Sequence, residues 1–181
     1  MLHVSPFNHC PRCALRVEGA GTREFRCPHC GFRYFHNVAT ATGAFVVHGD
    51  ELLVARRAND PGKGMLDVPG GFADPGESLE ASLARELAEE LGWTTLPATP
   101  TYLCSQPNVY PYADVTYATM DAFFVLACTH RPAAVAADDV AAIGWVARDA
   151  LRLDEFAFPS TRAALARLLA GPWPGAGALT R

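Results

Sequence analysis

The chain has 181 residues, half of them hydrophobic and 19% charged, with a formal net charge of −4. This length suits one core-forming domain with a small appendage, and the composition is typical of a soluble globular protein. No apolar run approaches the roughly 20 residues of a membrane-spanning helix, and no basic stretch precedes an apolar segment at the N-terminus. We therefore expect a cytoplasmic protein that does not enter a membrane.

The chain begins with a cysteine-rich segment, residues 1–36, in which two C-x-x-C pairs are separated by thirteen residues. Two such pairs supply the four thiolates of a tetrahedral Zn²⁺ site, and a segment this short cannot bury enough core to fold without metal. We predict a small zinc ribbon with a structural, not catalytic, metal; redox-active thiols or disulfides are the alternative. The predicted zinc ligands are Cys10, Cys13, Cys27 and Cys30.

Residues 37–170 alternate between strand-like and helical patterns, which predicts an α/β sandwich domain. Two β-like runs at 39–47 and 51–57 flank His48-Gly49-Asp50, which predicts a hairpin. Glycine and proline from residue 171 onward predict a loose tail over 171–181. The other predicted strands cover 66–68, 101–105, 115–127 and 141–146, and the predicted helices cover 78–91 and 161–169.

The predicted helix over residues 78–91 carries three glutamates on one face. Glu86, Glu89 and Glu90 are three or four residues apart or adjacent, so their carboxylates gather beside a leucine stripe that repeats every four residues. Like charges at this spacing destabilise an isolated helix, and a divalent cation such as Mg²⁺ or Mn²⁺ reverses that cost. A solvated acidic face is the alternative interpretation of these residues alone.

The wider segment resembles the Nudix box, in which Gly is followed by five residues, Glu, seven residues, Arg-Glu, an aliphatic residue, one residue, Glu-Glu, one residue, Gly and an apolar residue. The matching positions are Gly71, Glu77, Arg85, Glu86, Leu87, Glu89, Glu90, Gly92 and Trp93. This resemblance implies a Nudix α/β/α sandwich with a mixed sheet, preceded here by the zinc ribbon.

The resemblance also implies roles for the residues of the box. Glu86 and Glu90 would bind the catalytic cation, with Glu89 as a further ligand or as the residue that activates water, and Arg85 would pair with Glu77. The backbone carbonyl of Gly71 would be another metal ligand. The implied reaction is attack of a metal-activated water on a phosphorus of a diphosphate, which releases a nucleoside monophosphate.

Some Nudix proteins recruit one more acid from outside the box. Asp139, just before the predicted strand at 141–146, is our candidate, and Asp138 and Asp121 are alternatives. Each of the three is otherwise expected to be a solvated carboxylate at the end of a strand or in a loop.

Residues 105–113 are similar to the substrate motif Ser-Gln-Pro-Trp-Pro-Phe-Pro-x-Ser of the NADH diphosphatase subgroup. Four positions depart from it, and Asn108 stands where the subgroup has Trp. We therefore keep three substrates open: NADH, ADP-ribose or a nucleoside diphosphate sugar. The predicted substrate-binding residues, on a recognition loop, are Gln106, Asn108, Tyr110 and Tyr112.

Two other functions compete with hydrolysis of a small nucleotide. One is a nucleic-acid-binding or nucleotide-sensing regulator that uses the ribbon, which is basic because it contains five arginines and only two glutamates. The other is removal of a nucleotide cap from RNA. The intact set of box glutamates favours an enzyme on a nucleotide substrate, with nucleic acid not favoured. We also expect a homodimer, because the ribbon segment is rich in aromatic residues: Phe7, Phe25, Phe32, Tyr34 and Phe35.

Overall fold

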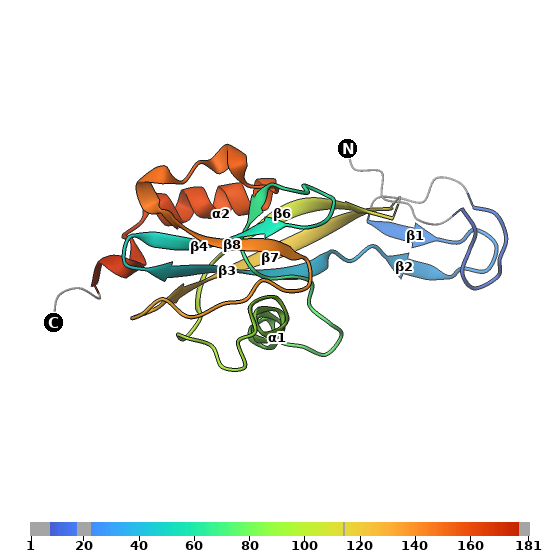
Figure 1. Cartoon of the computed structure of the whole chain (residues 1–181). Helices are drawn as coiled ribbons and strands as arrows, with labels where there is room; N and C mark the ends of the chain where they lie inside the picture. The colour runs from blue at the N-terminus through green and yellow to red at the C-terminus, as the bar shows by residue number, and fades with distance from the viewer. Residues whose placement is uncertain (1–7, 18–22, 114, 178–181) are drawn as a thin grey trace.

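The computed structural model describes residues 8–17, 23–113 and 115–177. It contains a six-stranded sheet with one helix on each face, and a two-stranded sheet that extends from one end of it (Figure 1). This arrangement confirms the predicted α/β/α sandwich with a mixed sheet. None of the described helices is long and apolar enough to cross a membrane.

The N-terminal unit is a small ribbon that contains β1 (Glu24–Arg26) and β2 (Arg33–Phe35), paired antiparallel. Its core consists of Cys10, Val17, Phe25 and Cys27, each at most 6% exposed, with Phe32 packed against them. This core is far smaller than a domain of this size needs to be stable alone. Residues 1–7 and 18–22 of the predicted ribbon lie outside the described residues.

The larger sheet has the strand order β5-β4-β3-β7-β6, with β8 on the free part of β4. The central pair, β3 and β7, is parallel and all other pairs are antiparallel. Gly49, with φ at 55°, turns the predicted hairpin between β3 and β4. The strands are β3 (Ala39–His48), β4 (Glu51–Arg57), β5 (Leu66–Asp67), β6 (Thr101–Tyr112), β7 (Val115–Ala127) and β8 (Val140–Ala147).

Two hydrophobic cores fill the spaces between the sheet and its helices. On one face, α1 (Leu79–Leu91) buries Leu83, Leu87 and Leu91 against β3 and β7. On the other face, α2 (Pro159–Ala170) buries Leu165 and Leu168. The sandwich is completed by three 3-10 turns at Arg148–Ala150, Leu153–Glu155 and Pro174–Gly177.

Local signals set both ends of α1, the helix that carries the glutamates. The Ser78 hydroxyl accepts a hydrogen bond from the Ala81 amide and so caps the N-terminus. Gly92, at φ 74°, adopts the left-handed conformation that ends a helix, and its amide donates back to the last turn. The leucine stripe then fixes which face α1 turns to the sheet.

Two sequence predictions differ from the structure. The strand predicted over residues 101–105 continues to Tyr112, so the predicted recognition loop is the second half of β6. The tail predicted to be loose from residue 171 is packed at Trp173, which is 6% exposed and donates its indole N–H to the Gly49 carbonyl at 2.7 Å. Residues 178–181 of that tail lie outside the described residues.

Candidate active site

A cavity of about 360 Å³ joins the acidic face of α1 to the surface of β3, β6 and β7. At one side it is lined by Glu86, Glu89 and Glu90, and at the other by Tyr110 and Phe158. The two sides belong to segments far apart in the sequence, and the sheet brings them together. One continuous space therefore combines carboxylates with aromatic rings.

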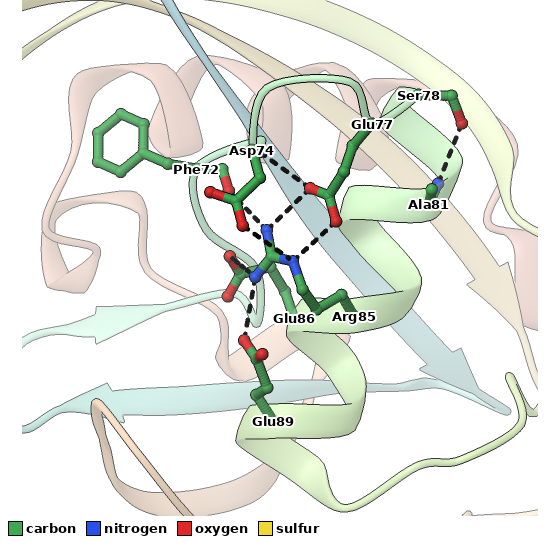
Figure 2. Close-up of polar contacts among 8 residues, drawn as sticks. All are labelled: Phe72, Asp74, Glu77, Ser78, Ala81, Arg85, Glu86 and Glu89. Carbon is green, nitrogen blue, oxygen red and sulfur yellow. Dashed lines mark hydrogen bonds and ion pairs between the residues drawn. The ribbon is translucent and has the colours of Figure 1, made fainter.

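Arg85 is the hub of the acidic side (Figure 2). Its Nε and Nη2 donate to the two carboxylate oxygens of Glu77 at 2.9 and 3.0 Å, and Nη2 also donates to the Phe72 carbonyl at 2.8 Å. Its Nη1 donates to Glu86 at 2.8 Å and to Glu89 at 3.0 Å. The hydrogen bonds from Arg85 lower the pKa of Glu77, and those pairs raise the pKa of Arg85 itself. Arg85 thus fastens the glycine-rich loop to α1.

Glu86 and Glu90 are carboxylates held in a partly dry environment. Glu90 is 7% exposed and accepts a hydrogen bond from the Gly70 amide at 2.8 Å. Burial raises the pKa of Glu90 to about 8, against the lowering effect of the Gly70 amide. Burial also raises the pKa of Glu86, against the hydrogen bond from Arg85. A bound cation would favour the ionised form of these two carboxylates, so the site is suited to a cation.

Two glycines allow the loop to approach the helix and the sheet. Gly70 has φ of 141°, and a Cβ there would lie 2.1 Å from the Thr42 carbonyl oxygen. A Cβ on Gly71 would lie 2.6 Å from the Glu86 carboxylate carbon. The Gly71 carbonyl, our predicted metal ligand, accepts a hydrogen bond from the Thr42 amide at 2.8 Å at the edge of β3. The structure thus gives this oxygen a role in the sheet, which the prediction did not include.

All three acids considered outside the box line the cavity. The Asp139 carboxylate accepts a hydrogen bond from the Asn59 amide at 2.7 Å. Asp138, at φ 51°, is bonded to no described side chain, and its charge is among those that raise the pKa of Glu86. Asp121 is 9% exposed and lies on the aromatic side. Asp138 is therefore as well placed as Asp139 to assist.

The predicted substrate-binding residues divide into two pairs. Asn108 and Tyr110 line the cavity, whereas Gln106 and Tyr112 do not, and Tyr112 is 62% exposed. Sequence reasoning missed Phe72 and Phe158, whose rings lie 5.2 and 5.7 Å from that of Tyr110. Phe72 directly follows the box glycine Gly71, so its position in the sequence could have marked it as a cavity residue. No local sequence pattern marks Phe158.

The four predicted zinc ligands converge in the ribbon. Their sulfur atoms all lie within 4.8 Å of one another, and Cys10–Cys30 and Cys13–Cys27 are each 3.7 Å apart. A disulfide bond is about 2.05 Å long. A tetrahedron with Zn–S bonds of about 2.3 Å has edges of about 3.8 Å, so the spacing fits a zinc ion. Among the described residues no other group of this kind is found.

Fold and site together define an α/β/α sandwich with an acidic active-site cavity beside a glycine-rich loop. The family model for the NUDIX domain matches residues 38–168. The chain therefore belongs to the Nudix family and carries an N-terminal cysteine cluster.

Individual relatives agree with this membership. The chain is 34% identical over 111 residues to the NAD-capped RNA hydrolase NudC of Stutzerimonas stutzeri, a match that covers 61% of this chain and 39% of the relative. It is 34% identical over 61 residues to the ADP-ribose pyrophosphatase of Methanocaldococcus jannaschii, which covers 34% and 36%. The chain thus spans less than half the length of these curated relatives. A Nudix hydrolase from Nitrosomonas europaea shares the fold, with a TM-score of 0.61, 19% identity and 91% of each chain covered.

Proposed function

We propose that this protein hydrolyses the diphosphate bond of a nucleoside diphosphate derivative and releases a nucleoside monophosphate. The observation that carries the proposal is the single cavity in which Glu86, Glu89 and Glu90 face the rings of Tyr110 and Phe158. A nucleotide whose base lies against the rings would extend its diphosphate toward the carboxylates. NADH, ADP-ribose and nucleoside diphosphate sugars all have this form.

The acidic side fits Mg²⁺ or Mn²⁺, which prefer carboxylate oxygens. Glu86 and Glu90 would hold the cation, and Glu89, Asp138 and Asp139 line the same cavity as further candidate ligands. Gly71 leaves space for the Glu86 carboxylate, because any side chain at Gly71 would overlap it. A bound cation supplies neutralisation of the diphosphate charge and a more acidic water. Arg85 and Glu77 would keep the loop in position for substrate.

The named relatives narrow the proposal toward substrates that contain an adenosine diphosphate unit. One is called an NAD-capped RNA hydrolase and the other an ADP-ribose pyrophosphatase. Removal of a nucleotide cap from RNA is our second candidate, because the ribbon adjoins β3, whose Ala41 and Thr42 line the cavity. All five of its arginines are exposed, and four of them form no ion pair among the described residues: Arg12, Arg16, Arg23 and Arg26.

A panel of substrates tests the proposal. We expect NADH, ADP-ribose, nucleoside diphosphate sugars or NAD-capped RNA to yield a nucleoside monophosphate when Mg²⁺ or Mn²⁺ is present, and no product when the cation is chelated. Products are identified by chromatography. Lack of hydrolysis across the whole panel with both cations would refute the assignment.

Zinc binding by the ribbon leads to a separate prediction. The Cys27→Ser variant should lose most of its zinc and become more sensitive to protease within residues 8–36, because the ribbon core alone is too small to hold the fold. Elemental analysis and limited proteolysis measure the two effects. Cys128→Ala, which removes a buried thiol of the sandwich core, is the matched control and should keep its zinc. Full zinc occupancy in Cys27→Ser would contradict the four-cysteine site.

We also propose that the protein is a cytoplasmic homodimer. Phe25 and Phe32 are used within the ribbon core, so the aromatic surface is smaller than the sequence predicts. Tyr34 and Phe35 remain 41% and 48% exposed, and they support a contact between two ribbons. Phe7 lies outside the described residues. Light scattering in solution measures the mass directly.

A further inference from the structure

Asp121 lies at the centre of a hydrogen-bond network beneath the aromatic side of the cavity. Its carboxylate accepts from the hydroxyls of Thr119 and Ser160 at 2.6 Å each and from the side-chain amide of Asn108 at 2.9 Å. Asp121 and Thr119 belong to β7, Asn108 to β6 and Ser160 to the first turn of α2. The network therefore ties three elements together where the cavity wall is built.

The network fixes which end of the Asn108 amide faces the carboxylate. The Asn108 side chain presents its NH₂ group to Asp121, donating from Nδ2 to Oδ2 at 2.9 Å. Its Oδ1 is then directed away from Asp121, and no described residue donates a hydrogen bond to it. Since Asn108 lines the cavity beside Tyr110, this part of the wall offers an acceptor and not a donor.

The rings around Asn108 form a place for a flat heterocycle. The ring of Phe72 lies edge-on to that of Tyr110, and the ring of Phe158 is tilted relative to Tyr110. The guanidinium carbon of Arg57 lies over the Phe158 ring, 4.7 Å from its centroid. Ala41 and Gly43 of β3 also line the cavity, and the Phe123 ring packs over Gly43, where a Cβ would lie 3.0 Å from it. A base held against these rings would turn one hydrogen-bonding edge toward Asn108.

We propose that Asn108 selects a base that carries an exocyclic amino group, such as adenine, over its oxo counterpart, such as hypoxanthine. The inference rests on the proposed function, since it concerns the nucleotide of that same site. Asp121 is a positioning residue, which acts through the orientation of the Asn108 amide. An amino group donates to the Asn108 oxygen, whereas a carbonyl group would face a second acceptor, which is unfavourable.

A closely matched pair of substrates tests this effect. ADP-ribose and inosine diphosphate ribose have the same diphosphate and differ at the base in the 6-substituent, amino against oxo, and in N1, an acceptor in adenine and an N–H donor in hypoxanthine. We expect kcat/KM to favour the adenine compound by at least about tenfold, the value of one lost hydrogen bond. In Asn108→Ala the ratio should fall to near one, because the acceptor is gone.

Asp121→Ala should lower the same ratio of kcat/KM values even though Asp121 does not contact the substrate. An Asn108 amide released from Asp121 can present either its oxygen or its NH₂ group to the base. The ratio does not depend on the fraction of folded protein, so partial unfolding does not imitate this result. Thr116→Ala, an exposed position of β7 outside the cavity, is the matched control and should keep both activity and ratio. A ratio that stays high in Asn108→Ala would overturn the inference.

The outcomes separate this inference from the proposed function. Equal hydrolysis of the two substrates by the wild-type protein overturns the reading of Asn108 and leaves the hydrolase assignment intact. Hydrolysis of neither excludes these two substrates and leaves the hydrolase assignment to the wider substrate panel. In that case the affinities for AMP and IMP, measured by calorimetry, still test Asn108: a preference for AMP of at least about tenfold supports it, and equal affinities overturn it.

Discussion

Glu90→Gln should abolish catalysis and at the same time stabilise the cation-free protein. Turnover should fall by at least about 10²-fold, because a charge that helps to hold the cation is removed. Stability should rise on the order of 2 kcal/mol near pH 7, because burial raises the pKa of Glu90 to about 8 and the fold resists its ionisation. Glutamine keeps an oxygen for the Gly70 amide, so the hydrogen bond survives.

The effect of Glu90 on stability has a defined dependence on pH. The folded carboxyl holds its proton up to about pH 8, whereas the unfolded one releases it above about 4.5. The contribution of the protonated group is therefore complete below about pH 4.5 and is lost as the pH rises to 8. Melting curves with EDTA should show the gap between Glu90→Gln and wild type widening over this window. A constant gap would mean that the Glu90 carboxyl ionises normally.

Arg85→Lys should reduce turnover by about 10²-fold while the fold persists. A lysine carries one point charge and cannot pair with Glu77 through two parallel hydrogen bonds while also binding the Phe72 carbonyl. The glycine-rich loop should then lose its fixed position on α1, and substrate would no longer be aligned. Steady-state kinetics with ADP-ribose, together with a thermal melt, measure both consequences.

Arg152→Lys is the control for that substitution. Arg152 is exposed, and its side chain donates only to the backbone carbonyls of Asp149 and Leu151, so the same chemical change should leave turnover unaltered. If Arg85→Lys also retained wild-type kcat, the proposed role of Arg85 as the fastening between loop and helix would be wrong.

The parts of the fold encoded by local signals could be predicted from the sequence. The serine cap, the leucine repeat and Gly92 gave the bounds of α1 almost to the residue, because each acts within one turn of the helix. The hairpin of β3 and β4 is equally local. Helical spacing placed the three glutamates on one face of α1, and the resemblance to the Nudix box singled them out as a site. The cysteine pairs followed from their spacing as metal ligands.

The parts that depend on distant neighbours could not be predicted. The strand predicted to end at residue 105 continues through Pro107 and Pro111, because β6 is an edge strand, where a missing N–H breaks no ladder. Phe158 reaches the cavity only because α2 packs on the same face of the sheet as Tyr110. Single hydrogen bonds in the network around Asp121 join residues up to 39 positions apart, so no window of sequence reveals it.

The indole of Trp173 holds the backbone of Gly49, 124 positions earlier, and a Cβ on Gly175 would lie 1.9 Å from that same carbonyl oxygen. The first hairpin of the sandwich is thus covered by a segment that is synthesised 124 positions later. Until that segment has emerged from the ribosome, the turn and the neighbouring edge of the core stay uncovered, at a stage when a nascent chain is prone to aggregation.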